Sequence, residues 1–93
     1  METNYKYWND FFSRWPTDMP RHGILVTSFN EQISFSSFWT SENLLMLERH
    51  TPDSQGARSV ILPYDQILAL KITDVTRPRQ FKTAGFEGPM PTI

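Results

Sequence analysis

The spacing of apolar residues changes its period near residue 23, and this change divides the chain into a helical and a β-rich part. Before that point aromatic residues recur at intervals of three, four and three: Tyr5, Trp8, Phe12 and Trp15. Such spacing is typical of one face of an amphipathic helix. Thr3 or Asn4 can supply the N-cap oxygen, and Pro16 disfavours helical geometry in the residue before it. The pattern predicts a helix over residues 4–15 whose aromatic face packs over the rest of the fold.

From Gly23 onward, short runs of β-branched, aliphatic and aromatic residues alternate with turn residues, as in β-strands. The predicted strands are Ile24–Phe29, Ile33–Thr40, Leu44–His50, Arg58–Pro63 and Ile67–Asp74. Their short connections favour antiparallel neighbours. Only one turn separates the last two strands, which requires a sharp change of direction. The sequence therefore predicts a mostly β fold, with a five-stranded, strongly bent antiparallel barrel over residues 23–74.

The polar and apolar faces of these strands give a second prediction. Ile33 and Phe35 lie on one face of the second strand, but Phe38 breaks the alternation and indicates a bend near the serines. The runs at residues 44–47 and 67–72 carry apolar side chains on both faces. One face must point inward, and the other needs the helix, the tail or a neighbouring subunit to cover it. This favours a homo-oligomer, with coverage by the helix and tail as the alternative.

The composition changes after Asp74, where prolines and glycines are interspersed with isolated apolar residues. This composition predicts an extended tail over residues 75–93. Four apolar side chains can anchor it to the barrel or to a partner: Phe81, Phe86, Met90 and Ile93. The length of 93 residues leaves no room for a second core, so residues 1–93 are expected to form a single domain.

Composition narrows the classes of function. Nine basic and ten acidic residues give a formal net charge of -1, so no global positive field attracts phosphate backbones. The chain has no cysteine, which excludes disulfides, a thiolate nucleophile and Cys-ligated zinc. Its first residues lack the charged and apolar segments of a signal peptide, and no long apolar run follows. We expect a soluble, cytoplasmic protein without membrane contact.

The residues that most often carry chemistry show no catalytic spacing. His22 and His50 are far apart and have no metal-ligand spacing with another strong ligand. Most carboxylates occupy turns or strand ends, where they satisfy backbone donors, and no Gly-x-Ser-x-Gly motif surrounds a serine. Asp65 is expected to stabilise the turn between the last two strands. We therefore expect no catalytic residue, no metal site and no cofactor, and an enzyme is the least favoured class.

The order of elements resembles the Sm-like small barrel, which the Lsm and Hfq types exemplify. The resemblance spans about residues 4–74, as a match of pattern more than of motif. It depends on Phe29-Asn30 at the first turn, on Asn43-Leu44 entering the third strand, and on residues 61–67 at the last junction. The sequence departs from the family pattern at Glu31 and Ser36, where glycines are usual, and lacks the Arg-Gly pair in the last connector.

The resemblance implies rings in which the fourth strand of one subunit pairs with the fifth strand of the next. The interface candidates on these strands are Val60, Leu62, Ile67, Ala69 and Lys71. It also implies that single-stranded RNA contacts the loops at residues 41–43 and 63–66. The candidate contacts there are Asn43, Tyr64 and Gln66, and the candidate phosphate partners nearer the C-terminus are Arg77, Arg79 and Lys82.

Three functional hypotheses therefore remain open at this level, and the third and least favoured is a small enzyme or ligand-binding barrel, which needs a concave pocket with convergent polar groups. The first is a non-catalytic Sm-like oligomer that binds single-stranded RNA. The second is a protein-interaction scaffold of the same SH3-like or Sm-like form, which uses aromatic or strand-edge surfaces without nucleic acid. The near-neutral charge favours the second, whereas the basic residues near the C-terminus favour the first.

Overall fold

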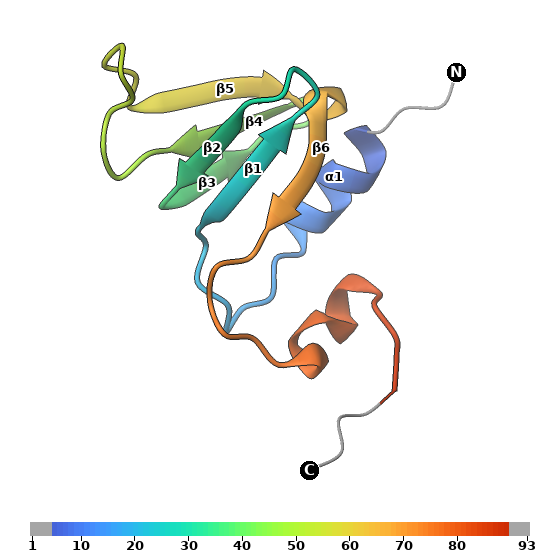
Figure 1. The fold of residues 1–93 in the computed structure, drawn as a ribbon. Helices are drawn as coiled ribbons and strands as arrows, with labels where there is room; N and C mark the ends of the chain where they lie inside the picture. The colour runs from blue at the N-terminus through green and yellow to red at the C-terminus, as the bar shows by residue number, and fades with distance from the viewer. Residues whose placement is uncertain (1–4, 90–93) are drawn as a thin grey trace.

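The computed structural model describes residues 5–89, which form one α-helix, six β-strands and two 3-10 helices (Figure 1). The α-helix is α1 (Tyr5–Ser13). The strands are β1 (Gly23–Thr27), β2 (Gln32–Phe35), β3 (Ser37–Thr40), β4 (Leu44–Glu48), β5 (Ser59–Pro63) and β6 (Ile67–Lys71). The 3-10 helices are η1 (Tyr64–Gln66) and η2 (Pro78–Ala84). The predicted mostly β architecture with a helix near the N-terminus is confirmed.

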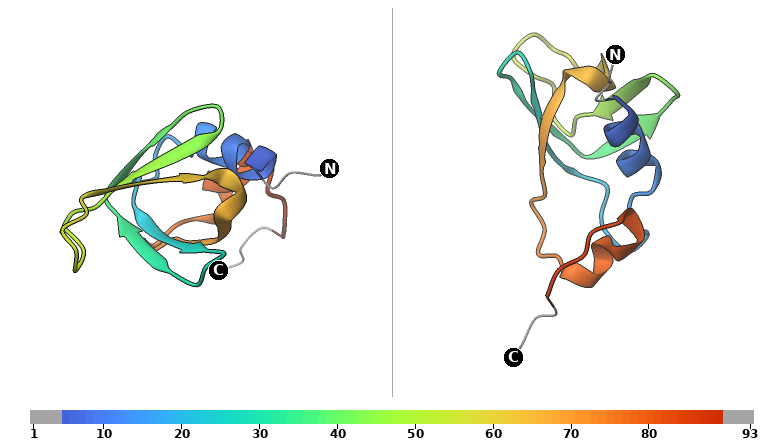
Figure 2. Two further views of the ribbon diagram at one scale, coloured as in Figure 1. Left: turned by 90° about the horizontal axis from the view of Figure 1, so that it is seen from above. Right: turned by 90° about the vertical axis from the view of Figure 1, so that its right-hand side faces the viewer.

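The strands form two three-stranded antiparallel sheets, in the orders β2-β1-β6 and β3-β4-β5. The chain passes from one sheet to the other at Ser36, between β2 and β3, and again at η1, between β5 and β6. Figure 2 shows the two sheets inclined to one another, with β5 and β6 diverging from η1. In the part of the chain that the structure describes, β5 and β6 do not pair, and the sheets do not close into a barrel.

The bend expected in the second predicted strand lies at Ser36 and divides that strand into β2 and β3. Ile33 and Phe35 are buried before the bend, and Phe38 is buried after it. The Ser36 amide donates a 2.7 Å hydrogen bond to the Glu48 carbonyl, which keeps the bend attached to β4. One extra residue at the bend thus lets both halves of the strand direct apolar side chains into a common core.

The one-turn connector between the last two strands is η1, and its first residue fills the core. Tyr64 is completely buried, and its hydroxyl donates a 3.1 Å hydrogen bond to the Ser41 carbonyl. Asp65 is exposed and accepts a hydrogen bond from the Gln66 side chain at 3.3 Å, not from a backbone amide. The connector therefore joins the two sheets through a buried aromatic ring.

Helix α1 packs on the interior side of the second sheet. Phe12 stacks on Trp15 with ring centroids 5.6 Å apart, and its ring meets Phe38 of β3 edge to face at 4.9 Å. All three are buried with the aliphatic core of both sheets. The helix ends at Ser13, two residues before the predicted end, and the Trp15 indole donates to the Met19 carbonyl at 3.0 Å. The predicted N-cap residues Thr3 and Asn4 lie outside the described residues.

The tail expected to be extended contains the 3-10 helix η2, so that part of the prediction is wrong. Pro78 stands at the start of η2. Proline is favourable there, because the backbone N–H that it lacks would have no hydrogen-bond partner within the helix. The Gln80 side chain accepts a 2.6 Å hydrogen bond from the Arg77 amide. Gly85 ends the helix with a φ of 96°, which favours glycine. Two predicted anchors, Met90 and Ile93, lie outside the described residues.

Candidate functional site

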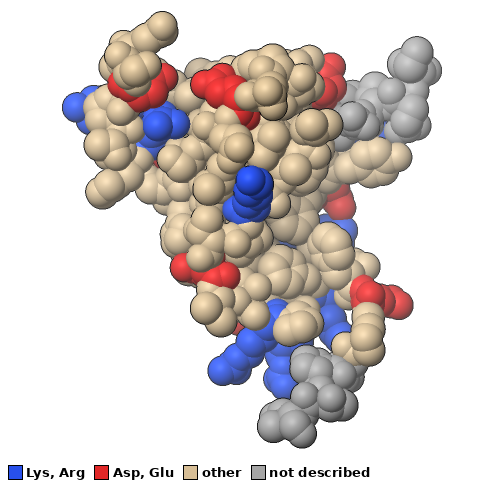
Figure 3. Space-filling model, viewed as in Figure 1, with Lys and Arg blue, Asp and Glu red and all other residues tan. Residues whose placement is uncertain are grey.

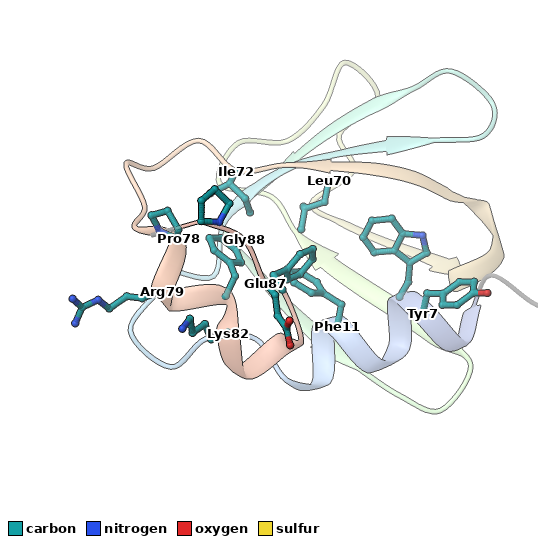
Figure 4. Close-up of a pocket in the computed structure, with 13 residues that line it drawn as sticks. Tyr7, Phe11, Leu70, Ile72, Pro78, Arg79, Lys82, Glu87 and Gly88 are labelled. Atoms are coloured by element: carbon teal, nitrogen blue, oxygen red, sulfur yellow. The ribbon is translucent and has the colours of Figure 1, made fainter. Parts of the chain in front are cut away.

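A pocket of about 720 Å³ lies between α1, β6 and the segment from η2 to Pro89 (Figure 4). We call it the η2 pocket. Its lining is mostly aromatic and aliphatic: Tyr7, Trp8, Phe11, Leu70, Ile72, Pro78, Arg79, Phe81, Lys82, Phe86, Glu87, Gly88 and Pro89. Its volume lies in the range of about 300–1,000 Å³ that is usual for small-molecule sites.

The walls of the η2 pocket are held together by aromatic contacts between α1 and the C-terminal segment. Phe11 meets Trp8 edge to face at 6.4 Å and Phe86 at 6.1 Å. Phe86 in turn meets Phe81 at 5.9 Å. Edge-to-face rings attract one another beyond the burial of their area, so these contacts fix η2 against α1. The pocket therefore exists because the tail is folded back as η2.

Charged side chains are confined to one side of the η2 pocket. Arg79 and Lys82 project from η2, and Figure 4 places them away from the Tyr7 end of α1. Glu87 follows η2 and is the one acidic residue among the described residues that line the pocket. All three are exposed, and none forms an ion pair with another described residue. Figure 3 shows Lys and Arg gathered at this end of the molecule. The charged lining residues sum to +1, opposite in sign to the whole chain.

A second surface lies on the outer face of the sheet β3-β4-β5. Trp39, Met46 and Ile61 stand opposite one another in the strand register and form a row across this face, which we call the outer row. Trp39 is 61% and Ile61 62% exposed. Helix α1 does not cover this row, because it packs against Phe38 on the other face of β3. The row is a contiguous apolar feature of the kind that marks interaction surfaces.

Only part of the predicted oligomer interface is accessible. Leu62 and Ile67 point into the core and are buried, so they are corrected to core residues. Val60 and Ala69 are half-buried. Lys71 is exposed and donates a hydrogen bond to the Gln32 side chain at 3.3 Å.

The accessible apolar side chains of these two strands are Ile61 of β5 and Leu68 of β6, which sequence reasoning missed. Leu68 is 66% exposed. It is an extra residue in β6, because Val26 stands opposite Ala69 while the next residue, Thr27, stands opposite Ile67. Such a bulge moves the side chains beyond it to the opposite face of the sheet. The apolar run at residues 67–72 contains no residue that indicates where the bulge lies.

The two loops that carry the candidate RNA contacts meet, because the Tyr64 hydroxyl donates a hydrogen bond to the Ser41 carbonyl. Tyr64 is buried, so its ring has no free face on which a base can stack. Asn43 is exposed, whereas Gln66 is half-buried and bonded to Ser28 and Asp65. The candidate phosphate partners form a separate group on and before η2, at the opposite end of β6 from η1 (Figure 1): Arg77, Arg79 and Lys82.

The titratable groups form no metal site among residues 5–89, where no group of three or more His, Cys, Asp or Glu residues could hold a metal ion. His22 lies 3.0 Å from Asp74 and also contacts the Thr73 hydroxyl at 3.4 Å, and His50 is exposed. Burial raises the pKa of the Tyr64 hydroxyl. Hydrogen bonds from the backbone amides of Ala57 and Gln55 lower the pKa of Asp53, which closes the loop before β5.

Comparison of the chain with protein-family models, with curated proteins and with solved structures found no match. Within the described residues, no helix has both the length and the apolar character needed to cross a membrane.

Proposed function

We propose that this protein is a non-catalytic assembly module of the Sm-like, small-barrel kind, which associates with further copies of itself through β5 and β6. One observation supports the proposal above the others. Both strands lie at the edge of a sheet, and each exposes a large aliphatic side chain, Ile61 or Leu68. An open edge with exposed apolar side chains is a template for pairing with another strand.

A second copy is the partner that fits both edges. Each chain offers β5 and β6 on different sheets, so β5 of one copy and β6 of the next can extend a sheet across the contact. Such a head-to-tail contact repeats into a ring or a filament. The formal net charge of -1 adds little repulsion between copies. The Leu68 bulge and Lys71 oppose indiscriminate pairing, which favours one register.

The outer row adds apolar area beside the β5 edge. Ile61 belongs to both features, because it lies on the edge strand and ends the row that begins at Trp39. A neighbouring copy that pairs with β5 therefore covers Ile61 and the side chains next to it. Burial of aromatic and aliphatic surface at the centre of a contact supplies most of its affinity.

Sedimentation equilibrium of the full chain tests this proposal. The wild-type protein is expected to sediment as an oligomer at micromolar concentration. Ile61→Asp and Leu68→Asp should each shift the mass toward the monomer, because a charge would replace apolar surface that the neighbouring copy covers. Val75→Asp is the matched control, since Val75 is fully exposed outside the strands and should leave the mass unchanged.

A strictly monomeric wild-type protein would overturn self-assembly and leave the scaffold hypothesis, in which the outer row meets a different protein. RNA binding is tested in the same samples with oligo-U and oligo-A at low salt. Salt-sensitive binding that Arg77→Ala and Lys82→Ala weaken would instead support the RNA hypothesis. Its absence, with an oligomer present, supports assembly without nucleic acid.

A further inference from the structure

The η2 pocket combines an apolar interior with a cationic side, and this combination restricts what can bind there. Rings from α1 and from the C-terminal segment face Leu70 of β6 and Ile72, which follows β6, across the pocket (Figure 4). A purely polar molecule would gain little from such walls, whereas burial of an apolar group is favourable in proportion to its area. The occupant must therefore have an apolar body that enters between Trp8, Leu70 and Phe81.

The charged side chains of the pocket favour a particular charge at the polar end of the occupant. Arg79 and Lys82 stand on the η2 side, and neither is paired with another described residue. Both have long side chains whose stems can line apolar surface while the charged heads remain in water. Glu87 reduces the charge of the lining but does not reverse it. An anionic head placed at this side meets two cations, whereas a cationic head meets one carboxylate.

We propose that the η2 pocket binds a small amphipathic carboxylate, with its apolar chain between α1, β6 and η2 and its carboxylate beside Arg79 and Lys82. This site shares β6 with the proposed assembly surface, but Ile61, Leu68 and the outer row do not line it. The proposal therefore does not depend on self-association. Guanidinium and ammonium groups are the usual protein partners of a carboxylate.

Isothermal titration calorimetry with decanoate, below its micelle concentration, tests the proposal. Decanol and decylammonium serve as ligands with the same chain and a neutral or positive head. Decanoate should bind more tightly than both. In the series from hexanoate to decanoate, each added methylene should strengthen binding by up to roughly fourfold, as expected for burial of a CH₂ group.

Charge variants separate the two parts of the site. Arg79→Glu with Lys82→Glu should weaken decanoate binding by at least roughly threefold and should favour decylammonium. Both substitutions replace an exposed cation that attracts the carboxylate with an anion that repels it. Glu87→Gln should strengthen decanoate binding. Lys6→Glu with Arg58→Glu changes the net charge of the chain equally at exposed positions that do not line the pocket, and is the matched control.

Amide chemical shifts place the ligand. Decanoate should perturb α1, β6 and the segment from η2 to Pro89, and leave β3 and β4 unchanged. Three results would overturn the proposal: no binding of decanoate, equal binding of decanoate and decanol, or perturbations confined to the outer row. The charge variants lie on the surface, so a folded spectrum is expected for each and loss of binding can be assigned to the pocket.

Discussion

Gly23 lies at the start of β1, where the neighbouring strand leaves no space for a side chain. A Cβ atom at this position would lie 2.7 Å from the Lys71 carbonyl oxygen of β6, which is backbone and cannot rotate away. Gly23→Ala should therefore lower the free energy of unfolding by about 1–3 kcal/mol, as the strands separate to admit the methyl group. Urea denaturation measures the change.

Gly88→Ala is the control for this variant, because no atom lies within 4 Å of a Cβ there. Its unfolding midpoint should match that of the wild-type protein. Equal midpoints for both variants would contradict the close approach of β1 and β6.

Tyr64 gives a prediction about pH, since burial raises the pKa of its hydroxyl above the ordinary value of about 10. Between the unfolded and the folded pKa, the folded state holds a proton that the unfolded state has released. The contribution of Tyr64 to stability is therefore complete below about pH 10 and is lost as the pH rises further. Above this pH, the midpoint temperature of thermal unfolding should fall more steeply with pH for the wild-type protein than for Tyr64→Phe.

At neutral pH, Tyr64→Phe should lower the free energy of unfolding by about 0.5–1.5 kcal/mol, because the hydrogen bond to the Ser41 carbonyl is lost. Parallel pH profiles for the two proteins would show that the Tyr64 hydroxyl is accessible to water, contrary to its burial.

Residue patterns predicted some local features and missed others for a physical reason. The bend near Ser36 was predictable, because Ile33, Phe35 and Phe38 violate the alternation within one strand. The Leu68 bulge was not, because a bulge is a property of the register between two strands. Leu62 and Ile67 were predicted at an interface and their side chains lie in the core, because strand parity alone does not say which face is the core.

At the scale of elements, the aromatic side chains of α1 are buried to very different extents. Phe12 is fully buried against Phe38 and Trp15, whereas Tyr7 is mostly exposed on the same helix. Phe12→Ala should therefore destabilise the protein by about 3–5 kcal/mol through the cavity that it leaves. Tyr7→Ala should change the free energy of unfolding by less than about 0.5 kcal/mol, as is usual for a surface substitution.

Calorimetric or denaturant unfolding of both variants tests this difference. A small effect of Phe12→Ala would mean that α1 does not pack on the second sheet in solution.

The element that sequence analysis missed is η2. The prolines and glycines of residues 75–93 suggested an extended tail, although Pro78 and Gly85 also stand where proline begins and glycine ends a helical turn. Such signals are weak without the contacts that stabilise so short a helix, and those contacts come from Phe11 of α1. Because the η2 pocket depends on this packing, it could not be predicted from local sequence.

At the scale of the whole molecule, the hairpin pairs were predictable, but the pairing of β1 with β6 and the lack of closure were not. The short connections correctly indicated three antiparallel pairs, β1-β2, β3-β4 and β4-β5, and a sharp turn before β6. Whether β5 and β6 then pair depends on how far η1 separates the two sheets, which follows from three-dimensional geometry and not from the residues of the turn. Among the described residues, four strands therefore lie at a sheet edge, namely β2, β3, β5 and β6, and the edges of β5 and β6 are the basis of the proposed assembly.

Hydrogen exchange distinguishes the two proposed sites in one molecule. The central strands β1 and β4 have partners on both sides, so their amides should exchange slowly at every protein concentration. If copies pair through their edges, amides of β5 and β6 that face away from β4 and β1 should become protected as concentration rises. Decanoate at low protein concentration should instead protect α1 and η2, because these elements line the pocket and lie outside the strands. Ile61→Asp should abolish the protection of β5 and β6 at high protein concentration and leave the protection of α1 and η2 by decanoate.

If high protein concentration also protected α1 and η2, or if decanoate also protected β5, the assembly surface and the η2 pocket would not be distinct.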